Sequence, residues 1–262
     1  MMKSFMQRVL ISLKAEWGLS IMKIRLINGD CLEEMKSIPD GSIDMILADV
    51  PYGTTRCAWD SIIDLELMWE QLKRIIKTNG AIVLTSGQPF TSTLITSNQK
   101  SFKYEMIYEK TNAKGFLSAK YRPLTAHENI LVFGKAKTYN PQKWIMPEHL
   151  RTKRKSATMK KTGEVYGNGE ITRWDDDGSR HPTSVVGFSN RTGRSGNYHP
   201  TQKPVALMEY LIKTYTNEGE TVLDFAAGSF TTGVACKNLN RSFVGIELDQ
   251  GYYDIGCKRM AD

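Results

Sequence analysis

Short apolar runs of the kind that form buried strands alternate along the chain with segments whose apolar residues recur every three or four positions, as in amphipathic helices. Strands are expected at residues 24–27, 43–48, 81–85, 104–109, 129–134, 221–224 and 242–247, and helices at 32–38, 65–77, 90–97, 204–216 and 231–239. Asn79 and Gly80 are expected to end the second helix. Strands that alternate with crossover helices indicate an α/β fold, a mostly parallel twisted sheet with helices on both faces.

The first 21 residues precede this pattern. Lys3 and Arg8 precede a short apolar patch, but the run at 9–13 is too short for a secretory signal and no small-residue cleavage site follows. Met22 begins a sequence that reads like a natural start. We therefore expect residues 1–21 to be an N-terminal extension, either an upstream translation start or an appended amphipathic helix.

One long segment, residues 141–198, lacks clear periodicity. It carries eleven Lys and Arg against six Asp and Glu, most of the excess that gives the whole chain a net charge of +7. A long irregular segment inside a compact α/β domain is usually a functional loop or a small subdomain, although a solvated, partly disordered insertion is the alternative. The 262 residues fit one large domain with such an insertion, divided as 22–140, 141–198 and 199–262.

The composition excludes several classes of protein. Charges interrupt every apolar run well short of the ~20 residues that a membrane span requires, so no membrane association is expected. The four cysteines form no CxxC pair, which argues against a zinc site and a redox dithiol and favours reduced thiols in a cytoplasm. The pI near 9.1 suggests a polyanionic partner.

A strand, a turn of small residues and a helix start occupy residues 221–233, and Glu247 ends the next strand, 19 residues after Gly228. This is how Rossmann-type sheets bind a nucleoside, because small residues let the backbone approach the ligand and an acidic side chain accepts hydrogen bonds from ribose. A tight strand-to-helix turn without a ligand is the competing interpretation.

Two further motifs point to chemistry. Asp49-Val50-Pro51-Tyr52 directly follows a buried strand, where open α/β sheets bind ligands. A carboxylate, a free backbone carbonyl and an aromatic ring suit a planar group that carries an amino nitrogen, although an Asp-capped β-turn explains most such strings. The segment 199–204, His-Pro-Thr-Gln-Lys-Pro, precedes a helix. It could hold a carboxylate there, with a capping role for His199 as the simpler interpretation.

These motifs, in this order, resemble the β-group of S-adenosylmethionine-dependent DNA amino-methyltransferases. The resemblance runs from about Lys23 to Met260 and also covers Asn28-Gly-Asp-Cys31, Asn129-Ile-Leu-Val-Phe-Gly134 and Gly245-Ile-Glu-Leu-Asp249. It implies a Rossmann-like methyltransferase fold, with residues 22–140 as the catalytic half, 199–262 as the cofactor half and 141–198 as the target-recognition insertion. It also implies methyl transfer to the exocyclic amino group of a flipped base, without a metal.

The resemblance assigns roles to individual residues. Asp49, Val50, Pro51 and Tyr52 would hold the target base, and Asp at the first of these positions goes more often with adenine N6 than with cytosine N4. The cofactor would lie against Asp30, Cys31, His199, Thr201, Lys203, Asp224, Ala226, Gly228, Phe230, Glu247 and Leu248. Double-stranded DNA would be gripped by the basic residues of the insertion, Arg151, Lys153, Arg154, Lys155, Arg191 and Arg194. A homodimer and a cognate restriction endonuclease are further partners that the resemblance allows, in a bacterial or phage-encoded, nucleoid-associated protein.

Two residues depart from the family pattern. Val50 stands where the family usually has a proline, and this change should be tolerated because the useful group there is the backbone carbonyl. Phe230 replaces the second glycine of a Gly-Ser-Gly turn. A phenylalanine there is expected to strain the turn or to fill the cofactor space. The alternatives are therefore a catalytically impaired DNA-binding protein, a cytosine-N4 enzyme, an RNA or protein amino-methyltransferase and, least compatible with the Asp49–Tyr52 motif, a nicotinamide-dependent oxidoreductase.

Overall fold

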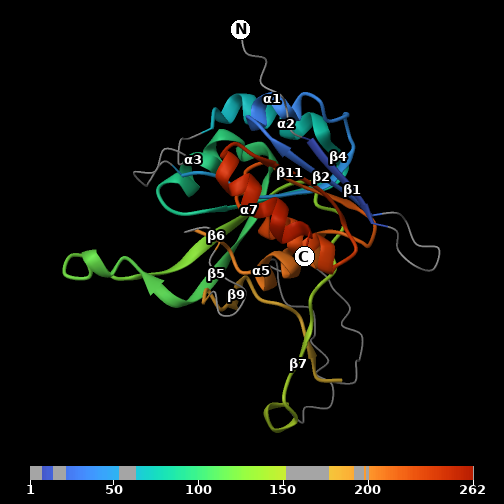
Figure 1. Cartoon of the computed structure of the whole chain (residues 1–262). Helices are drawn as coiled ribbons and strands as arrows, with labels where there is room; N and C mark the ends of the chain where they lie inside the picture. The colour runs from blue at the N-terminus through green and yellow to red at the C-terminus, as the bar shows by residue number, and fades with distance from the viewer. Residues whose placement is uncertain are drawn as a thin grey trace. The chain divides into compact units, whose positions relative to one another are not determined.

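The computed structural model describes residues 8–13, 22–52, 63–151, 177–191, 198 and 201–261 (Figure 1). Its longer helices are α1 (Cys31–Met35), α2 (Leu65–Ile75), α3 (Phe90–Ser97), α5 (Val205–Tyr215), α6 (Thr231–Asn238) and α7 (Gln250–Ala261). Its strands are β1 (Arg8–Leu13), β2 (Met22–Asn28), β3 (Ile43–Asp49), β4 (Ile76–Ser86), β5 (Phe102–Lys114), β6 (Thr125–Gly134), β7 (Trp144–Ile145), β8 (Ser179–Arg180), β9 (Val185–Phe188), β10 (Thr221–Asp224) and β11 (Ser242–Glu247). No helix in these described ranges has both the length and the apolar character needed to cross a membrane.

Nine strands form one sheet in the order β1-β2-β11-β10-β3-β4-β6-β5-β9. The five strands from β2 to β4 are parallel, whereas β1 pairs antiparallel with β2, and β6 pairs antiparallel with both β4 and β5. The predicted α/β fold, with a mostly parallel sheet, is confirmed. Because parallel strands end at the same edge, the loops after β2, β11, β10 and β3 lie side by side.

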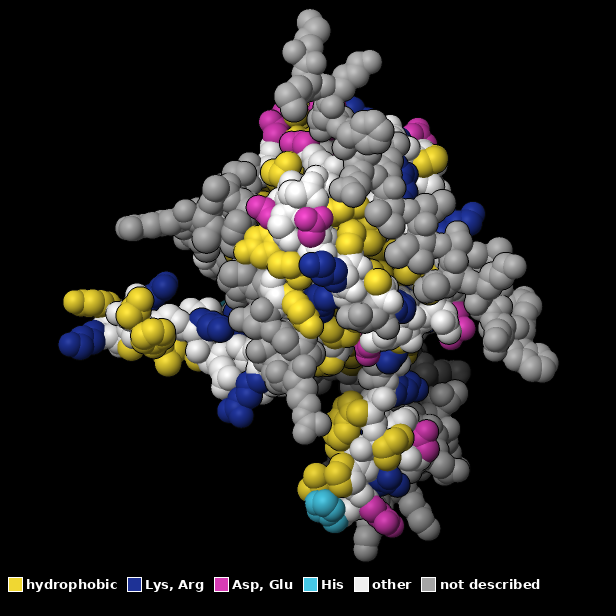
Figure 2. Space-filling model, in the orientation of Figure 1, with side chains coloured by type: hydrophobic (Ala, Val, Ile, Leu, Met, Phe, Trp, Pro, Cys, Tyr) yellow, Lys and Arg dark blue, Asp and Glu magenta, His cyan; other side chains and the backbone are white. Residues whose placement is uncertain are grey.

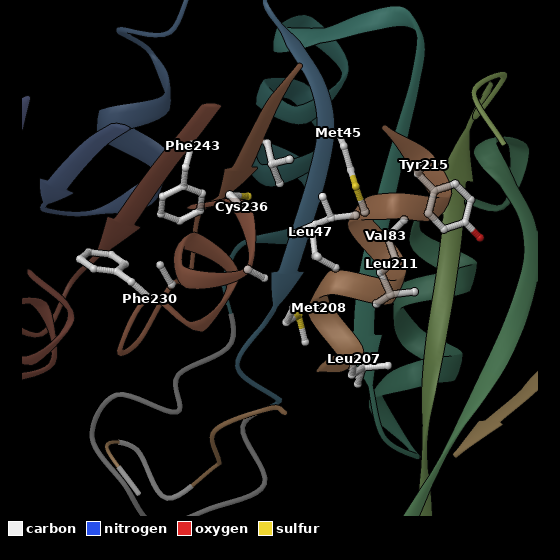
Figure 3. Close-up of a cluster of buried hydrophobic side chains, with 14 of the residues drawn as sticks. Met45, Leu47, Val83, Leu207, Met208, Leu211, Tyr215, Phe230, Cys236 and Phe243 are labelled. Carbon is white, nitrogen blue, oxygen red and sulfur yellow. The ribbon is translucent and has the colours of Figure 1, made fainter. Parts of the chain in front are cut away.

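Two apolar layers cover the sheet. On one face, α5, α6 and α7 pack against alternate strand residues such as Leu26, Leu47 and Val83. Figure 3 shows Leu47 and Val83 in this buried cluster. On the other face, α1, α2 and α3 pack against the strand residues that alternate with these, such as Ile27 and Ile46. Successive side chains of a strand point to opposite faces, so strands buried on both sides read as continuous apolar runs.

Several element boundaries differ from those expected. The second predicted helix ends at Ile75 instead of continuing to 77, because Ile76 is already extended and pairs with Ile43 at the start of β4. Residues 8–13 form a strand on the edge of the sheet, so the expectation of an amphipathic helix there is wrong. The C-terminal helix α7 was not predicted, since its two glycines and weak apolar periodicity conceal it.

The described chain divides into two compact units, residues 141–183 and the rest. The smaller unit holds the two-stranded pairing of β7 with β8. Strand β9, by contrast, belongs to the large sheet, where it runs parallel to β5. The irregular segment expected at 141–198 therefore contributes one strand to the main unit.

The side chain of Phe230 lies in the core. Its backbone has a left-handed conformation, with φ 55°, and its ring is 0% exposed. The ring makes edge-on contacts with Phe243 and Tyr253, at centroid distances of 6.2 and 5.8 Å. Figure 3 shows it beside Phe243 in the buried cluster. A β-carbon on Gly256 would come within 2.3 Å of the ring, so that glycine makes the room that the phenylalanine fills.

At position 230, the glycine variant should therefore be more stable than the alanine variant, which reverses the order usual at buried positions. Loss of the ring is expected to lower the free energy of unfolding by about 3–5 kcal/mol in Phe230→Ala. Phe230→Gly should be less destabilising by about 1 kcal/mol, because glycine adopts a left-handed conformation without strain. Urea denaturation of both variants measures the difference.

The same pair of substitutions at Phe243 provides the matched control. Phe243 is equally buried but lies in the extended strand β11, so Phe243→Gly should be more destabilising than Phe243→Ala. If Phe230→Gly is also the less stable of its pair, backbone strain at Phe230 does not contribute measurably to stability.

Candidate functional site

Four acidic residues lie along one edge of the sheet, at the ends of four adjacent strands. Asp30 follows β2, Glu247 ends β11, Asp224 ends β10 and Asp49 ends β3. The register aligns them, since Glu247 pairs with Asn28 and Asp224 pairs with Gly245. Residues as far apart in the chain as Asp30 and Glu247 are thus brought to one continuous edge, where open α/β sheets bind their ligands.

The carboxylate of Asp49 is the most heavily contacted group at this edge. One oxygen accepts hydrogen bonds from the Tyr52 hydroxyl, at 2.8 Å, and from the Thr85 hydroxyl. The other oxygen accepts from the Lys203 ammonium. The side chain is still 25% exposed, so it remains open to a ligand on its solvent side. The side chain of Val50 is buried in the core, so only its backbone is available to a ligand in this motif.

Tyr52 is held on two sides. Its ring stacks on Phe90, with centroids 5.7 Å apart and planes inclined by 27°. Burial, and then the negative charge of Asp49, raise the pKa of its hydroxyl well above the usual value. The phenol therefore stays protonated and donates its hydrogen bond at any ordinary pH.

Lys203 connects the Asp49 carboxylate to the hairpin of β5 and β6. Its ammonium is buried, with 7% of the side chain exposed, and pairs with Glu128 at 3.1 Å as well as with Asp49. Glu128 also pairs with Lys110. Burial by itself lowers the pKa of Lys203, but the charge of Asp49, together with Tyr52 and Glu128, more than compensates and raises it well above the usual value. Lys203 is therefore a permanent cation directly on Asp49, rather than on the loop of Asp224.

At the end of β11, Glu247 organises the turn of small residues after β10. Its two carboxylate oxygens accept hydrogen bonds from the backbone N–H groups of Gly228, at 2.7 Å, and Asp249, at 2.8 Å. The Glu247 carbonyl accepts from Gly29 N–H at 3.0 Å, which joins the loops after β2 and β11. The neighbouring Leu248 side chain is exposed.

Asp30 and Cys31 start helix α1. Asp30 caps it, because its carboxylate accepts the N–H of Leu32 at 2.8 Å. Burial, and then Asp30, raise the pKa of the Cys31 thiol to about 12, so it is not a nucleophile. Together with Glu247 and Leu248, these residues offer carboxylate acceptors beside an exposed apolar side chain. This arrangement fits a nucleoside such as that of S-adenosylmethionine, whose hydroxyl groups would donate to the carboxylates and whose base would lie on Leu248.

The core position of Phe230 corrects the expectation that its ring fills the cofactor space. The ring packs under the turn, while Ala226 and Gly228 remain partly exposed at the sheet edge. The strain that was expected at this position is present as the left-handed backbone. Arg259 of α7, which the sequence did not suggest, supports the turn by donating to the Ser229 carbonyl and hydroxyl at 2.5 and 2.8 Å, and its guanidinium lies over the Tyr198 ring.

The remaining site predictions are only partly covered by the described residues. Thr201 is exposed, and His199 lies outside the described ranges, as do Lys153, Arg154, Lys155 and Arg194. Arg151 is half-buried and donates to the Met146 carbonyl at 2.9 Å within the smaller unit. Arg191 is exposed next to β9 in the main unit. The roles of these residues in DNA binding stay predictions.

Two residues of the site, Thr85 and Glu128, were not predicted from the sequence. Thr85 lies opposite Asp49 in the register of β4 with β3, so a polar pair at the end of an apolar run, Thr85-Ser86, was the available signal. Glu128 has no local signal, because its contact with Lys203 depends on the antiparallel return of β6.

Asp224 is buried at the centre of this edge. It accepts hydrogen bonds from the Thr232 hydroxyl at 2.6 Å and from the Ala226 N–H at 3.1 Å. Burial nevertheless raises its pKa to about 7. In the unfolded chain an aspartate titrates near pH 4, so between about pH 4 and 7 the unfolded state loses this proton first and the folded state loses stability as pH rises.

Asp224→Asn should remove this pH dependence while it keeps the shape of the side chain. Its free energy of unfolding, relative to that of the unchanged protein, is expected to increase from pH 5 to pH 8 by about 2–3 kcal/mol. Urea denaturation at each pH measures it. A difference that is constant with pH, or that shrinks as pH rises, would show that Asp224 is charged throughout.

Comparison with known proteins agrees with this geometry. Residues 43–258 match the N6/N4 DNA methylase family. The type II methyltransferase M.HpaI of Haemophilus parainfluenzae is 28% identical over 253 residues, covering 91% of this chain and 74% of the relative. The DNA adenine methyltransferase YhdJ of Escherichia coli K12 is also 28% identical over 253 residues, covering 90% of this chain and 82% of the relative.

Solved structures have the same fold. The M1.HpyAVI–SAM complex superposes with a TM-score of 0.61 at 25% identity, over 90% of this chain and 98% of that one. The cytosine-N4-specific PvuII DNA methyltransferase reaches a TM-score of 0.64 at 16% identity, over 90% of this chain and 86% of that one, a likeness of fold alone. The sheet edge with Asp49, Asp224 and Glu247 thus lies on a methyltransferase scaffold, and the chain belongs to the N6/N4 DNA methylase family, as its motif order predicts.

Proposed function

We propose that this chain transfers a methyl group from S-adenosylmethionine to the N6 amino group of an adenine in a specific sequence of double-stranded DNA. The observation that carries the proposal is the position of Asp49, at the end of a strand adjacent to the one that ends at Asp224. Asp49 would hold the amino group next to the ends of β10, β11 and β2, where Asp224, Glu247 and Asp30 would hold the cofactor. The relatives M.HpaI and YhdJ, both named as methyltransferases, support the same reaction.

The residues of the site have three tasks in this reaction. S-adenosylmethionine supplies the methyl group on a sulfonium, which is already a good leaving group, so the protein does not need to activate it. Asp49 accepts a hydrogen bond from the amino group and stabilises the positive charge that develops on the nitrogen as it attacks the methyl carbon. Thr85 and Tyr52 fix the carboxylate so that the nitrogen lone pair points along the line of attack. Once the new C–N bond has formed, the methylated nitrogen releases its surplus proton to solvent, which reaches the exposed side of Asp49.

Adenine is favoured over cytosine by the aspartate at position 49 and by YhdJ, which is named as an adenine methyltransferase. The target amino group is paired inside a duplex, so the base has to be extruded before Asp49 can reach it. We assign the grip on the DNA to the basic segment 141–198. A homodimer, a restriction endonuclease partner and a cytoplasmic, nucleoid-associated location are parts of the same proposal.

Mass spectrometry of digested DNA tests the proposal. Unmethylated plasmid and genomic DNA, incubated with the protein and S-adenosylmethionine, should gain N6-methyladenine. Asp49→Ala should lower the rate at least about 100-fold, because the amino group loses its acceptor. N4-methylcytosine as the only product would replace adenine by cytosine in the proposal, and no methylated nucleoside in any DNA offered would contradict it.

Substitution of Lys203 tests whether this residue acts on Asp49 or binds the cofactor. If its ammonium acts on Asp49, Lys203→Met should lower kcat at least about 10-fold but change the calorimetric Kd of S-adenosylmethionine less than about threefold. The matched variant Glu247→Gln, on the cofactor side, should instead weaken S-adenosylmethionine binding. A large loss of cofactor affinity in Lys203→Met, with kcat preserved at saturation, would place Lys203 at the cofactor as the family resemblance first implied.

A further inference from the structure

Strands β5 and β6 continue beyond the sheet as a two-stranded arm, the projection drawn in green in Figure 1. Its tip, residues 114–124, is locally ordered by its own backbone. Gly115 takes a left-handed conformation, and Ser118 N–H donates to its carbonyl at 3.0 Å. Tyr121 and Arg122 N–H groups both donate to the Ser118 carbonyl, at 2.9 and 3.1 Å. The tip therefore has a fixed shape.

Large apolar side chains are concentrated on this tip and are strongly exposed. The apolar tip residues are Phe116, Leu117, Tyr121 and Leu124, with 77%, 84%, 89% and 45% of their surface exposed. Figure 2 shows them as a yellow cluster at the end of the arm. Single exposed apolar residues are ordinary, but four within nine positions of one loop mark a surface that contacts something else.

The charge of the arm identifies the partner. From Lys110 to His127 the chain carries four Lys and Arg and no Asp or Glu. Three of these, Lys114, Lys120 and Arg122, lie on the tip and are exposed, and we call them the tip cations. A cationic rim around apolar and aromatic side chains is complementary to a polyanion that also offers flat apolar surfaces, which is the chemistry of nucleic acid bases between phosphates.

The arm starts at the catalytic edge. Strand β6 pairs antiparallel with β4, so its first residues lie at the edge where Asp49 ends β3, and Asn129 pairs with Ser86 there. The base of the arm is tied to Asp49 through the ion pairs of Lys110, Glu128 and Lys203. From Lys110 to Lys114 an extended chain advances about 13 Å, so the tip stands beyond the site on its open side.

A second clamp fixes the direction of the arm. The Asn190 side chain accepts from the Thr111 hydroxyl at 3.0 Å and from the Asn112 N–H at 2.9 Å, and donates to the Asn112 carbonyl at 2.9 Å. Arg191, next to it, is exposed and adds a positive charge at the base of the arm. The arm thus stands on the catalytic edge with its base held by charge and hydrogen bonds.

We infer that the tip of the arm inserts into duplex DNA beside the target base, an inference that rests on the proposed function. The apolar tip residues contact the neighbouring bases and occupy space that the extruded base leaves, while the tip cations bind phosphates on either side. Unstacking a base step costs a few kcal/mol, and an apolar wedge that fills the gap offsets part of this cost. The arm therefore makes target extrusion from a duplex possible, and single-stranded DNA does not need it.

A triple variant, Phe116→Ser, Leu117→Ser and Tyr121→Ser, tests the inference, with Leu67→Ser as the control. Leu67 is 49% exposed on α2, far in the topology from the arm, so its replacement removes exposed apolar surface elsewhere. Both proteins should fold normally, because only exposed side chains change. Methyl transfer is measured on one DNA preparation, offered as a duplex and after heat denaturation, and duplex affinity is measured separately by fluorescence anisotropy.

The triple variant should methylate duplex DNA at least about 30-fold more slowly and bind it at least about 10-fold more weakly, since stacking contributes about 1–3 kcal/mol per base. On denatured DNA its rate, and its affinity for S-adenosylmethionine, should stay within about threefold of those of the unchanged protein. Leu67→Ser should match the unchanged protein throughout.

The two measurements separate the inference from the proposed function. If the unchanged protein transfers no methyl group but its duplex affinity depends on the tip, the proposed function fails and the inference stands. Unchanged duplex affinity of the triple variant overturns the inference. So do equal losses on duplex and denatured DNA, conversion of a dimer to a monomer with duplex binding intact, or tip-dependent binding to anionic lipid vesicles without duplex binding.

Discussion

The buried ammonium of Lys203 joins the parts of this molecule that have to act together. It comes from the segment before α5, and it binds Asp49 at the end of β3 and Glu128 on β6. A buried cation is costly unless it is paired, so the three elements are tied to one arrangement. The same positive charge counterbalances the Asp49 carboxylate. Glu128 in turn forms an ion pair with Lys110 at the base of the arm. The Asp49 carboxylate, the start of α5 and the hairpin of β5 and β6 are thus positioned by a single network of charges.

The turn between β10 and α6 depends on packing instead. Phe230 places its ring between Phe243 and Tyr253, and the small residue at Gly256 makes room for it. The turn above it is then held from the other side by Glu247 and Arg259. A strained backbone conformation at Phe230 persists because the ring is fixed in the core, and the residue that looked like an obstacle in the sequence is a support of the turn.

The sheet, most helices and the sheet-edge acids could be predicted because each depends on local periodicity or on a rule about strand ends. Asp49, Asp224 and Glu247 were found in this way. The direction of the Phe230 ring could not be, since it is decided by Gly256, far along the chain. The family resemblance implies that Lys203 contacts the cofactor, which stays a prediction. Its contact with Asp49 had no local signal in the sequence, because it arises only when α5 packs on the sheet. The strand at 8–13 was missed because its residues do not alternate between apolar and polar, so that only its pairing with β2 identifies it.

A crystal structure of the chain with S-adenosylhomocysteine and a target duplex would test the central claim most directly. The account predicts an adenine outside the helix, its N6 within about 3 Å of an Asp49 oxygen, the cofactor across the ends of β2, β11 and β10, and the tip of the arm between the strands of the duplex. An intact duplex with Asp49 contacting only protein groups, or a base bound at another part of the sheet edge, would contradict it.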